Sequence, residues 1–438
     1  MATGESITKW NGKRSVEEDV LGLPSNDVKL TFQYEGKRTK EEILSLPPSE
    51  TIKLWKGGST TGLLNRLYFG DNLGILSTLR QEAEISGKVR LIYIDPPFST
   101  GSVFHTRSQK DAYMDLLTGI QYIEFMRRRL IFLRELLAND GSIYVHIDHN
   151  MAPYLKVVMD EIFGETNFRN WITRKKSNPK NYTRNQFGNV SDVILFYTKS
   201  DNYVWNRPYE KWTPESSTKE YQYIEKETGR RYKKVPVHAP GTRNGETGKP
   251  WKGMLPPPGK HWQFTPSTLD EMDARGEIYW SPNGNPRRKI YLENSEGKAL
   301  QDIWLDYRDA FNQNHKITGY PTEKNPDMLS MIIQASSNPG DLVLDCFTGS
   351  STTLAEASKL QRQWIGVDKS TEAISVTLRR FVFGSEPMGD FAGKKKKYTP
   401  NHSFFRIQDF VLYAALPYEN ELEDILHQWV DWVGPSEE

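Results

Sequence analysis

The sequence predicts an α/β protein with a parallel sheet, into which a β-rich segment is inserted. Apolar runs of strand length alternate with helical patterns over residues 63–170 and again over 326–383. The runs VRLIYID (89–95) and GSIYVHID (141–148) are continuously apolar, as in strands covered on both faces. Between about 171 and 310, short aromatic runs alternate with Gly, Pro and Asn, and the alternation of strand and helix patterns stops. Strand alternating with helix on both sides of that segment favours an α/β sheet.

The two α/β regions predict a series of local elements. The first region predicts an apolar run over 65–72, a helix through 73–79, strand 89–95, helix 120–138, strand 141–148 and helix 154–164. Asn139-Asp140-Gly141 closes the long helix with turn residues, and Gly164 stops the last one. The second region predicts helix 328–337, strand 342–347, helix 348–360, strand 363–368 and helix 371–383. The chain ends in a further helix that contains Trp429 and Trp432.

Composition excludes several classes of protein. Lys and Arg total 57 against 56 Asp and Glu, so a net charge of +1 excludes a uniformly basic nucleic-acid coat. Cys346 is the single cysteine of the sequence, which excludes a disulfide framework and a cysteine-rich zinc site, and no metal site is predicted. No window approaches 18 consecutive apolar residues, and the start MATGESITKW lacks the apolar core of a signal peptide. A soluble cytoplasmic protein without a membrane partner is expected.

The middle of the chain is locally basic and aromatic. Residues 171–260 carry 18 Lys and Arg but 8 Asp and Glu, together with seven tyrosines and four tryptophans (Trp171, Trp205, Trp212 and Trp251). Basic charge interleaved with aromatic rings is the pattern of a nucleic-acid surface. A solvated β-rich insertion whose tryptophans fill a small core fits the composition equally well, so the positions of these residues must decide.

Asp95, Pro96, Pro97 and Phe98 come directly after a predicted strand. The two prolines fix two φ angles and remove two N–H donors, so the loop is stiff and its carbonyl groups can accept hydrogen bonds. Asp95 and the Pro96 carbonyl would accept the two N–H groups of an exocyclic amine while Phe98 stacks on the ring that carries it. Two such acceptors would localise the nitrogen lone pair as it attacks. A turn with an Asp cap and a buried Phe is the alternative.

The segment DCFTGSS (345–351) lies between a predicted strand and a predicted helix, where α/β sheets bind nucleotide-like ligands. Gly349 permits close approach of the backbone, and the helix N-terminus after it favours a carboxylate. The segment lacks both the Gly-Lys-Ser/Thr of a P-loop and the G-x-G-x-x-G of a dinucleotide site. Asp368 ends the next strand, where an acidic residue hydrogen-bonds ribose hydroxyls or caps the next helix. Together these features indicate an adenosine-bearing ligand that carries an amino-acid carboxylate.

The order of these motifs resembles that of the β-class DNA amino-methyltransferases, bacterial enzymes that methylate adenine N6 or cytosine N4 with S-adenosylmethionine. The resemblance covers about 63–170 and 311–383 and rests on LYFGDNL (67–73), IDPPFSTG (94–101), GSIYVHID (141–148), GYPTEKNPDML (319–329), NPGDLVLDCFTGSSTT (338–353) and IGVD (365–368). It implies a Rossmann-like S-adenosylmethionine-dependent methyltransferase sheet with a permuted motif order. It divides the chain into an N-terminal extension (1–55), a catalytic half (56–170), a basic target recognition domain (171–310), a cofactor-binding half (311–383) and a C-terminal extension (384–438).

The resemblance also assigns roles to individual residues. The flipped target base would be held by the catalytic residues Asp95, Pro96, Pro97 and Phe98. The cofactor would be bound by Asp71, Asn72, Thr322, Lys324, Asp345, Phe347, Gly349, Ser350 and Asp368. Within that set, Asp345 would support the loop, Asp368 would hold the ribose, and Thr322 and Lys324 would close the pocket. DNA phosphates would be gripped by residues of the basic insert, namely Arg174, Lys175 and Lys176.

A few positions depart from the family pattern. Asn325 separates Lys324 from Pro326, where the family commonly has Pro directly after the Lys. Ser351 replaces a more usual glycine, which predicts an ordinary φ angle at 351 and a slightly different loop. Phe98 replaces a more usual Tyr, and Cys346 replaces a frequent Pro and is not a nucleophile. His105 and His146 lie near the catalytic half and are expected to be structural.

The favoured function is methylation of adenine N6 in double-stranded DNA by the modification enzyme of a restriction-modification system. Adenine is favoured because an Asp before the two prolines accompanies N6 activity more often than N4 activity in this family. The alternatives are a cytosine-N4 methyltransferase and a non-catalytic DNA-specificity subunit with a degenerate core. A dinucleotide-dependent dehydrogenase is disfavoured by the missing glycine motif, and an RNA or protein-amide substrate by the resemblance. The family resemblance implies two partners, a restriction nuclease subunit and a second copy of the chain in a homodimer.

Overall fold

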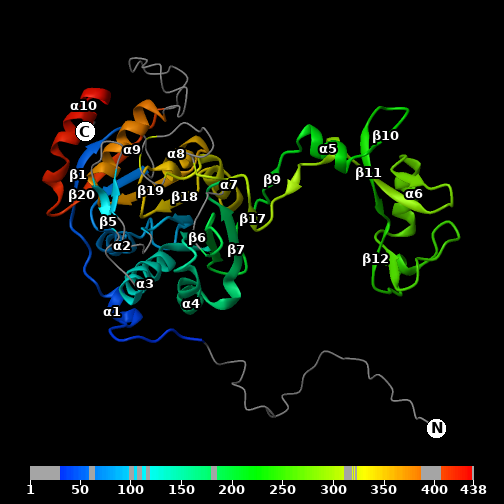
Figure 1. Cartoon of the computed structure of the whole chain (residues 1–438), viewed down its shortest axis with the longest axis horizontal. Helices are drawn as coiled ribbons and strands as arrows, with labels where there is room; N and C mark the ends of the chain where they lie inside the picture. Colours follow the sequence, from blue (N-terminus) through cyan, green and yellow to red (C-terminus); the bar gives the residue numbers. More distant parts are fainter. Residues whose placement is uncertain are drawn as a thin grey trace, which may run out of the picture. The chain divides into compact units, whose positions relative to one another are not determined.

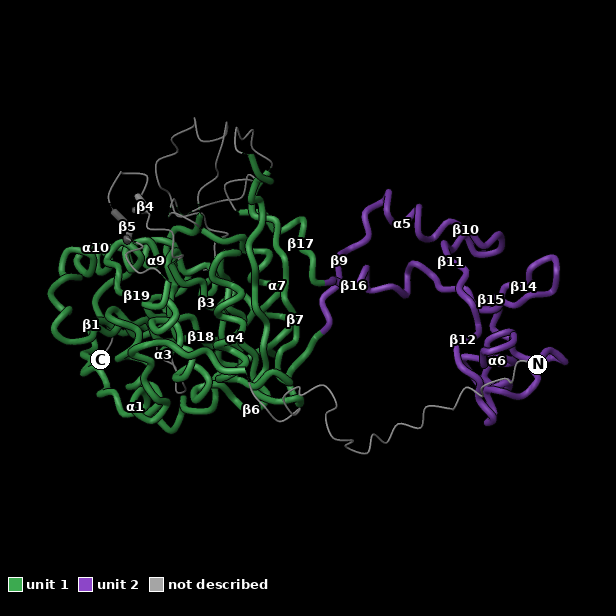
Figure 2. Tube along the Cα trace, turned by 60° about the horizontal axis from the view of Figure 1, so that its bottom comes forward, with its two compact units in different colours: residues 1–206, 302–438 green, residues 207–301 purple. Residues whose placement is uncertain are grey.

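The computed structural model describes residues 30–58, 65–97, 119–178, 185–309, 318, 320, 323–385 and 406–436, and the backbone alone of 103–105 and 111–114. The described residues form two compact units, which are coloured separately in Figure 2. The first unit belongs to 1–206 and 302–438, and the second is 207–301. Within the described ranges, no helix is long and apolar enough to cross a membrane.

A ten-stranded sheet forms the centre of the first unit (Figure 1). Its strands, in spatial order, are β1 (Thr51–Lys56), β20 (Phe410–Ala415), β2 (Asn65–Phe69), β19 (Gln363–Asp368), β18 (Leu342–Asp345), β3 (Val89–Ile94), β6 (Leu137–Ile147), β8 (Ser191–Thr198), β7 (Phe168–Lys175) and β17 (Ile303–Trp304). The strands from β20 to β6 are parallel, whereas β8 is antiparallel to both β6 and β7. A separate ribbon joins β4 (Val103–His105) to β5 (Asp111–Met114). The predicted α/β sheet is therefore confirmed.

Helices cover both faces of this sheet. One face carries α2 (Asn72–Gln81), α3 (Gly119–Leu136) and α4 (Ala152–Phe163), and the other carries α7 (Pro326–Ser336), α8 (Thr352–Lys359) and α9 (Thr371–Phe383) (Figure 1). On the first face, Leu76 and Leu130 are fully buried in the same apolar cluster as Ile92 of β3. On the second face, the Trp364 ring of β19 packs against Phe381 of α9, with 5.5 Å between centroids. Each helix corresponds to one that the hydrophobic periodicity predicts.

Segments from both ends of the sequence complete one edge of the sheet. β1 pairs with β20 in antiparallel fashion, and β20 in turn pairs with β2. The predicted C-terminal helix is α10 (Glu423–Val433), and its Trp429 is fully buried. The Trp429 ring lies 5.1 Å from Trp55 of β1 and 5.6 Å from Phe410 of β20. The segments that the sequence sets apart as extensions thus build part of the central sheet.

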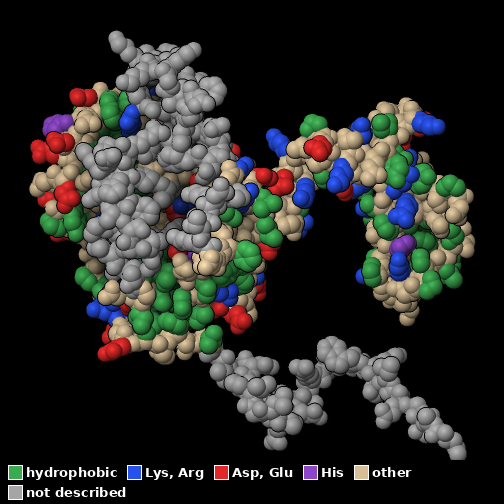
Figure 3. All heavy atoms as spheres, viewed as in Figure 1, with side chains coloured by type: hydrophobic (Ala, Val, Ile, Leu, Met, Phe, Trp, Pro, Cys, Tyr) green, Lys and Arg blue, Asp and Glu red, His purple; other side chains and the backbone are tan. Residues whose placement is uncertain are grey.

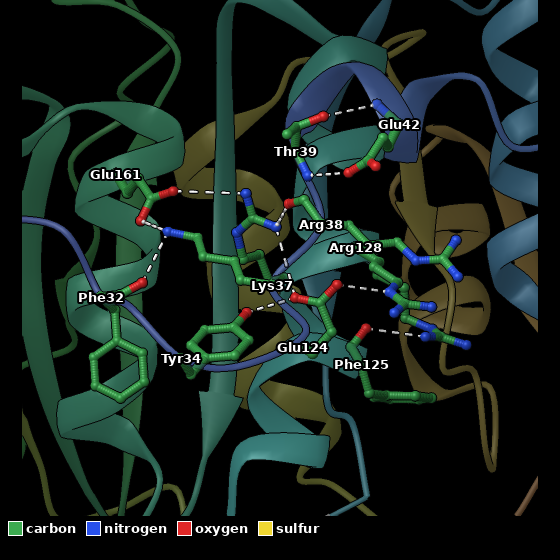
Figure 4. Close-up of polar contacts among 12 residues, drawn as sticks. Phe32, Tyr34, Lys37, Arg38, Thr39, Glu42, Glu124, Phe125, Arg128 and Glu161 are labelled. Carbon is green, nitrogen blue, oxygen red and sulfur yellow. Dashed lines mark hydrogen bonds and ion pairs between the residues drawn. The ribbon is translucent and has the colours of Figure 1, made fainter.

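Residues 32–42 run over α3 and α4 and are held there by charged groups (Figure 4). They lead into α1 (Lys40–Leu44). Lys37 Nζ lies 2.8 Å from Glu161 of α4, and the Tyr34 hydroxyl donates to Glu124 of α3 at 2.5 Å. Arg128 donates to the same Glu124 carboxylate at 2.8 Å. Burial opposes ionisation of Glu124, but the hydrogen bonds from Tyr34 and Arg128 outweigh it and lower its pKa.

The second unit has its own core and a four-stranded antiparallel sheet. The sheet order is β10 (Tyr223–Ile224), β11 (Arg231–Pro236), β15 (Pro286–Tyr291) and β14 (Ile278–Trp280). The remaining elements are β9 (Tyr209–Glu210), α5 (Pro214–Glu220), β12 (His238–Pro240), β13 (Lys260–Trp262), α6 (Pro266–Ala274) and β16 (Lys298–Ala299). Trp251 and Trp262 lie in the core with Leu269 and Ile278. The small β-rich core that the composition allowed is therefore present.

The insert is shorter than its composition predicts. β8 lies beyond the predicted boundary at 171 and pairs with β6 in the central sheet, and β7, which crosses that boundary, pairs with β8. The second compact unit therefore starts at Arg207. The tryptophans of the basic segment fit both interpretations of its composition. Trp251 is buried, as expected for a small core, whereas Trp171 and Trp205 are 37% and 43% exposed, as expected for an aromatic surface.

Candidate active site and its family

The predicted site residues lie at the carboxyl ends of neighbouring parallel strands. Asp71 comes after β2, Asp368 ends β19, Asp345 ends β18 and Asp95 comes directly after β3. From β18 the chain passes through α8 to β19 on one side, and from β3 it passes through α3 to β6 on the other. The strand order therefore reverses between β18 and β3. Open α/β sheets bind their ligands in the crevice at such a reversal.

Asp95 stands at this reversal with its two carboxylate oxygens in different surroundings. Its Oδ2 lies 2.6 Å from Lys324 Nζ, and its side chain is 18% exposed. Its Oδ1 is buried and accepts no hydrogen bond from the residues that the structure describes. Pro96 beside it is buried and Pro97 is half-buried. Phe98, the expected stacking residue, lies outside the described residues.

Lys324 is brought to Asp95, whereas the sequence places it in the cofactor pocket. It directly precedes Asn325, whose side-chain oxygen accepts from the backbone N–H groups of Asp327 and Met328 at the start of α7. The extra residue between Lys324 and Pro326 thus serves as the N-cap of α7, since Asn is a preferred residue there. Thr322, its predicted companion, is outside the described part of the chain.

The loop after β18 is organised by two buried carboxylates. Asp345 Oδ1 accepts from the backbone N–H of Phe347 at 3.0 Å. Asp368 Oδ2 accepts from the backbone N–H of Gly349 at 2.8 Å, and its Oδ1 accepts from that of Ser370 at 2.9 Å. Asp368 therefore joins the end of β19 to the loop and also braces the start of α9. The N-cap of α9 is Ser370, so the alternative that Asp368 itself caps this helix is wrong, and the contact with ribose stays a prediction.

Burial disfavours the charged form of both carboxylates. It raises the pKa of Asp345 to about 7, and the nearby charges of Asp95 and Asp368 act in the same direction. Burial also raises the pKa of Asp368, although hydrogen bonds from the backbone of Ser370 and Gly349 oppose it. Neither carboxylate makes an ion pair with any side chain of the described ranges. A cationic ligand would stabilise the ionised forms.

Gly349 and the two serines after it have tightly set conformations. Gly349 has φ +47°, and a Cβ there would lie 3.2 Å from the ring of Tyr320. Ser351 has φ +54°, so the ordinary φ expected for a serine is wrong. Its hydroxyl bonds to Thr377 of α9 at 2.5 Å, and the Ser350 carbonyl accepts from Arg380 at 2.7 Å. These contacts with α9 hold a backbone shape that costs a non-glycine residue roughly 1–2 kcal/mol.

Asp71 and Asn72 lie at the start of α2, and Asn72 connects this helix to the loop after β18. The Asp71 side chain caps α2 by accepting from the backbone N–H of Leu73 at 2.8 Å. Asn72 donates to the Cys346 carbonyl at 2.6 Å and accepts from Arg129 Nε at 2.5 Å. Arg129, which was not predicted as a site residue, is a 4% exposed residue of α3, and its burial lowers its pKa to about 10. The sequence feature that could have predicted its buried role is a charged residue on the apolar face of a helix.

A buried polar network lies behind Asp95 on β6, β7 and β8. His146 is fully buried, with Nδ1 2.7 Å from the Tyr93 hydroxyl and Nε2 3.0 Å from Asp192 Oδ2. Arg174 is also fully buried and lies 3.5 Å from Asp192 Oδ2 and in contact with Asp309. If Nε2–H donates to Asp192, Nδ1 can accept from Tyr93, so the neutral imidazole satisfies both contacts. The sequence contains one sign of this network, because His146 is a polar residue inside a continuously apolar strand.

Arg174 therefore does not fit the phosphate contact that the sequence predicts. Its guanidinium is enclosed by Asp192, Asp309 and the Tyr307 carbonyl, to which Nε donates at 2.9 Å. The next two residues, Lys175 and Lys176, are half-buried. Three consecutive basic residues look alike in the sequence, but alternation along β7 turns the first of them into the interior.

A family model described as DNA methylase matches residues 89–379, about two thirds of the chain. The chain belongs to the DNA methylase family. The Type II methyltransferase M.EcaI of Enterobacter cloacae is 48% identical to this methylase over 398 residues, which cover 89% of this chain and 87% of that protein.

More distant relatives include a subunit of a restriction-modification enzyme. The Type III EcoP15I Mod subunit of Escherichia coli is 28% identical over 401 residues, covering 74% of this chain and 61% of that subunit. Among solved structures, the cytosine-N4-specific PvuII DNA methyltransferase aligns with a TM-score of 0.43 and 13% identity. That alignment covers 87% of this chain and 97% of the PvuII chain.

The second unit of the methylase presents a face that is both aromatic and basic. Strand pairing places Tyr223, Tyr232, Tyr279, Tyr291, Lys234, Arg287 and Lys289 on the same side of its sheet, a set that we call the tyrosine–lysine face. Lys234 Nζ lies 3.6 Å from the Tyr223 ring centroid and 3.4 Å from that of Tyr279. Lys289 is neutralised by Glu225 at 2.6 Å. Figure 3 shows Lys and Arg side chains gathered on this unit.

Proposed function

We propose that this DNA methylase transfers a methyl group from S-adenosylmethionine to the N6 amino group of an adenine flipped out of double-stranded DNA. The observation that carries the proposal is the Asp95 carboxylate, whose Oδ1 is buried without a hydrogen-bond donor among the described residues. It stands at the strand-order reversal, one strand away from the loop of Asp345 and Gly349. An acceptor for an amine and a candidate cofactor loop thus lie at the carboxyl ends of adjacent strands.

The residues of the loop after β18 suit this cofactor. S-adenosylmethionine supplies an electrophilic methyl group on a positively charged sulfur. The buried carboxylates of Asp345 and Asp368 have raised pKa values and no cation in the described chain, so a cationic ligand suits them. Phe347, Gly349 and Ser350 would line the amino-acid end, and Asp71 and Asn72 the adenosine side. Asp368 would exchange part of its loop contact for ribose hydroxyls.

Asp95 and the Pro96 carbonyl would hold the target amine. Each would accept one of its two N–H groups, which leaves the nitrogen lone pair directed out of the ring plane. The new N–C bond would form as the bond between the methyl carbon and the sulfonium sulfur breaks, and the sulfur would leave as a neutral thioether. The nitrogen must then lose one proton, which Asp95 Oδ1 would accept as the base. Phe98 would stack on the flipped ring. Because the amine of a paired base lies inside the stack, the base has to leave the duplex first.

The second unit would supply DNA contacts. Lys234 and Arg287 of the tyrosine–lysine face make no ion pair with any acidic residue in the described ranges, so their charge is available to phosphates. Tyr223, 41% exposed, adds a ring at the margin of the same face. Lys175 and Lys176 remain proposed contacts, whereas Arg174 is removed from this set by its burial.

We also propose that the enzyme modifies DNA for a restriction-modification system. The resemblance to the EcoP15I Mod subunit, which is part of a Type III restriction-modification enzyme, supports this assignment. A restriction nuclease subunit and a second copy of the chain are the proposed partners. With bacterial DNA as substrate, the proposed site of action is the cytoplasm.

The test is a methyl-transfer assay with S-adenosylmethionine and unmethylated bacterial DNA, followed by digestion to nucleosides and mass spectrometry. N6-methyladenine is the expected product in the wild type, and Asp95→Ala should abolish it while cofactor binding, measured by calorimetry, is retained. N4-methylcytosine would keep the mechanism and change the base. No methylated base and no cofactor binding would favour the non-catalytic specificity subunit.

A further inference from the structure

Lys324 stands next to the proposed catalytic carboxylate in a rigid setting. Its side chain is 9% exposed, and its Nζ lies 2.6 Å from Asp95 Oδ2. The distance and the burial of both groups are those of a charge-assisted hydrogen bond shielded from solvent. An ammonium group in this place does more than neutralise charge, because it also decides which carboxylate oxygen is occupied.

The backbone on both sides of Lys324 is fixed by side-chain contacts. On the C-terminal side, Asn325 caps α7 and its Nδ2 donates to the Arg308 carbonyl at 3.0 Å. On the N-terminal side, Glu323 is 2% exposed, and its Oε1 lies 3.1 Å from Arg380 of α9. Its Oε2 accepts from the backbone N–H of Thr318 at 2.7 Å. The ammonium group is therefore delivered to Asp95 by a segment that is anchored on either side of it.

The other oxygen of Asp95 is left for a ligand. The His146 Nδ1 lies 3.9 Å from Oδ1, beyond hydrogen-bond distance. That nitrogen is instead 2.7 Å from the Tyr93 hydroxyl. A carboxylate can turn about its Cβ–Cγ bond and exchange its oxygens. With Lys324 on Oδ2, the buried Oδ1 is the one presented to a donor from outside the described protein.

We propose that Lys324 is a positioning residue for methyl transfer: it holds Oδ2 of Asp95 so that Oδ1 faces the target amine. This inference rests on the proposed function. It differs from a role in closing the cofactor pocket, which the family resemblance implies for Lys324. It also explains how Asp95 and the buried Asp345 can lie near each other, since the lysine charge offsets the repulsion between the two carboxylates.

A double-mutant cycle tests the proposal in the full-length chain. The variants are Lys324→Met, Lys324→Arg, Asp95→Asn and the Lys324→Met/Asp95→Asn double variant, with Lys359→Met as the matched control. Lys359 pairs with Glu356 on α8 and is 45% exposed. The readouts are the single-turnover methyl-transfer rate, the dissociation constant of S-adenosylmethionine by calorimetry and the melting temperature.

Lys324→Met should lower the single-turnover rate by about 10- to 100-fold, by analogy with the loss of groups that orient metal ligands. The dissociation constant of S-adenosylmethionine should stay at the wild-type value. Lys324→Arg should restore part of the rate, and Lys359→Met should have no effect. In the Asp95→Asn background, Lys324→Met should cause little further loss, because residues that act through one another are not additive.

Three outcomes would overturn the proposal. A wild-type rate in Lys324→Met would mean that the ion pair does not orient Asp95. Weaker S-adenosylmethionine binding, with losses that multiply in the double variant, would place Lys324 in the cofactor pocket. A crystal structure of Lys324→Met with the Asp95 carboxylate unmoved would contradict the proposal without reference to activity. Failure of the proposed function is distinguishable, because the wild type itself would then form no methylated base.

Discussion

Asp95, Asp345 and Asp368 occupy neighbouring strand ends, but they differ in what compensates their charge. Asp95 is paired with Lys324 at 2.6 Å, whereas Asp345 and Asp368 have hydrogen-bond donors but no ion pair within the described ranges. Burial raises the pKa of Asp345 to about 7, so this residue titrates near neutrality. A ligand with a positive charge would favour its ionised form.

We predict that binding of S-adenosylmethionine releases a fraction of a proton from Asp345. In the free enzyme at a pH somewhat below 7, the group is largely protonated, and a bound cation would lower its pKa and expel the proton. Affinity should therefore rise as pH increases toward about 7 and then level off. Calorimetry in two buffers with different ionisation enthalpies measures the proton count. Asp345→Asn should abolish the buffer dependence, and a binding heat that is independent of buffer in the wild type would contradict the prediction.

Arg174 is predicted to stabilise the fold and not to bind phosphate. Arg174→Met would leave Asp192 and Asp309 without their cation, and breaking a buried ion pair in this way costs about 3–5 kcal/mol of unfolding free energy. Lys175→Met is the matched control and should change it by less than about 0.5 kcal/mol. Urea denaturation measures the difference. Equal stability of the two variants would show that the buried network contributes little.

The pH dependence of this network has a defined sign. Burial alone would raise the pKa of Asp192, but His146 and Arg174 outweigh it and hold that pKa well below its ordinary range. The stabilisation is therefore present above the ordinary Asp pKa of 3.8 and is lost as pH falls through lower values. The destabilisation caused by Arg174→Met should shrink in the same direction.

At the scale of single residues, the sequence predicts the residues at strand ends better than the contacts of residues inside strands. Asp95, Asp345 and Asp368 are placed correctly at strand ends because each lies at the end of a local apolar run. Arg174 and His146 depend on which strands pair. His146 meets Asp192 only because β6 lies beside β8, and that pairing joins parts of the sequence that no local pattern connects.

The same distinction holds for whole elements. The predicted strands and helices over 65–164 and 328–383 are confirmed, because their hydrophobic periodicity is local. The turn predicted at 139–141 is wrong, since these residues lie inside β6. β1 and β20 were not predicted as strands of the sheet, since each is a short run whose partner lies near the other end of the sequence. Likewise, most of β7 and all of β8 lie within the residues predicted as the insert, but β8 takes its place from pairing with β6, and β7 from pairing with β8.

The segment over α3 and α4 is predicted to depend on the charge of Glu124. Glu124→Gln removes the anion that accepts from Tyr34 and Arg128, and it should lower the free energy of unfolding by about 1–3 kcal/mol. Because the pKa of Glu124 is lowered in the fold, its stabilisation is present above the ordinary Glu pKa of 4.5 and lost as pH falls. Chemical denaturation at several pH values measures this. Glu41→Gln, an exposed change in α1, is the control, and a loss of stability that does not vary with pH would exclude an electrostatic origin.

Across the whole molecule, charge is distributed between the two units with opposite signs. Residues 207–301 carry 17 Lys and Arg against 12 Asp and Glu, whereas the rest of the chain carries 40 against 44. The net charge of the whole chain conceals this difference. Since phosphate contacts dominate the salt dependence of DNA binding, a local excess of cations on one unit should govern how affinity changes with ionic strength.

The tyrosine–lysine face gives this expectation a specific test. Each phosphate contact contributes about 0.9 to the slope of log affinity against log salt concentration, so Lys234→Ala/Arg287→Ala should reduce the slope by about 2. Arg275→Ala is the control, because Arg275 already pairs with Glu277 at 2.9 Å. Binding to duplex DNA is measured by fluorescence anisotropy over a salt series, with S-adenosylmethionine affinity as the check on folding. An unchanged slope would mean that the cations of this face are committed to their tyrosine rings and that phosphate is bound elsewhere, with Lys175 and Lys176 as the next pair to remove.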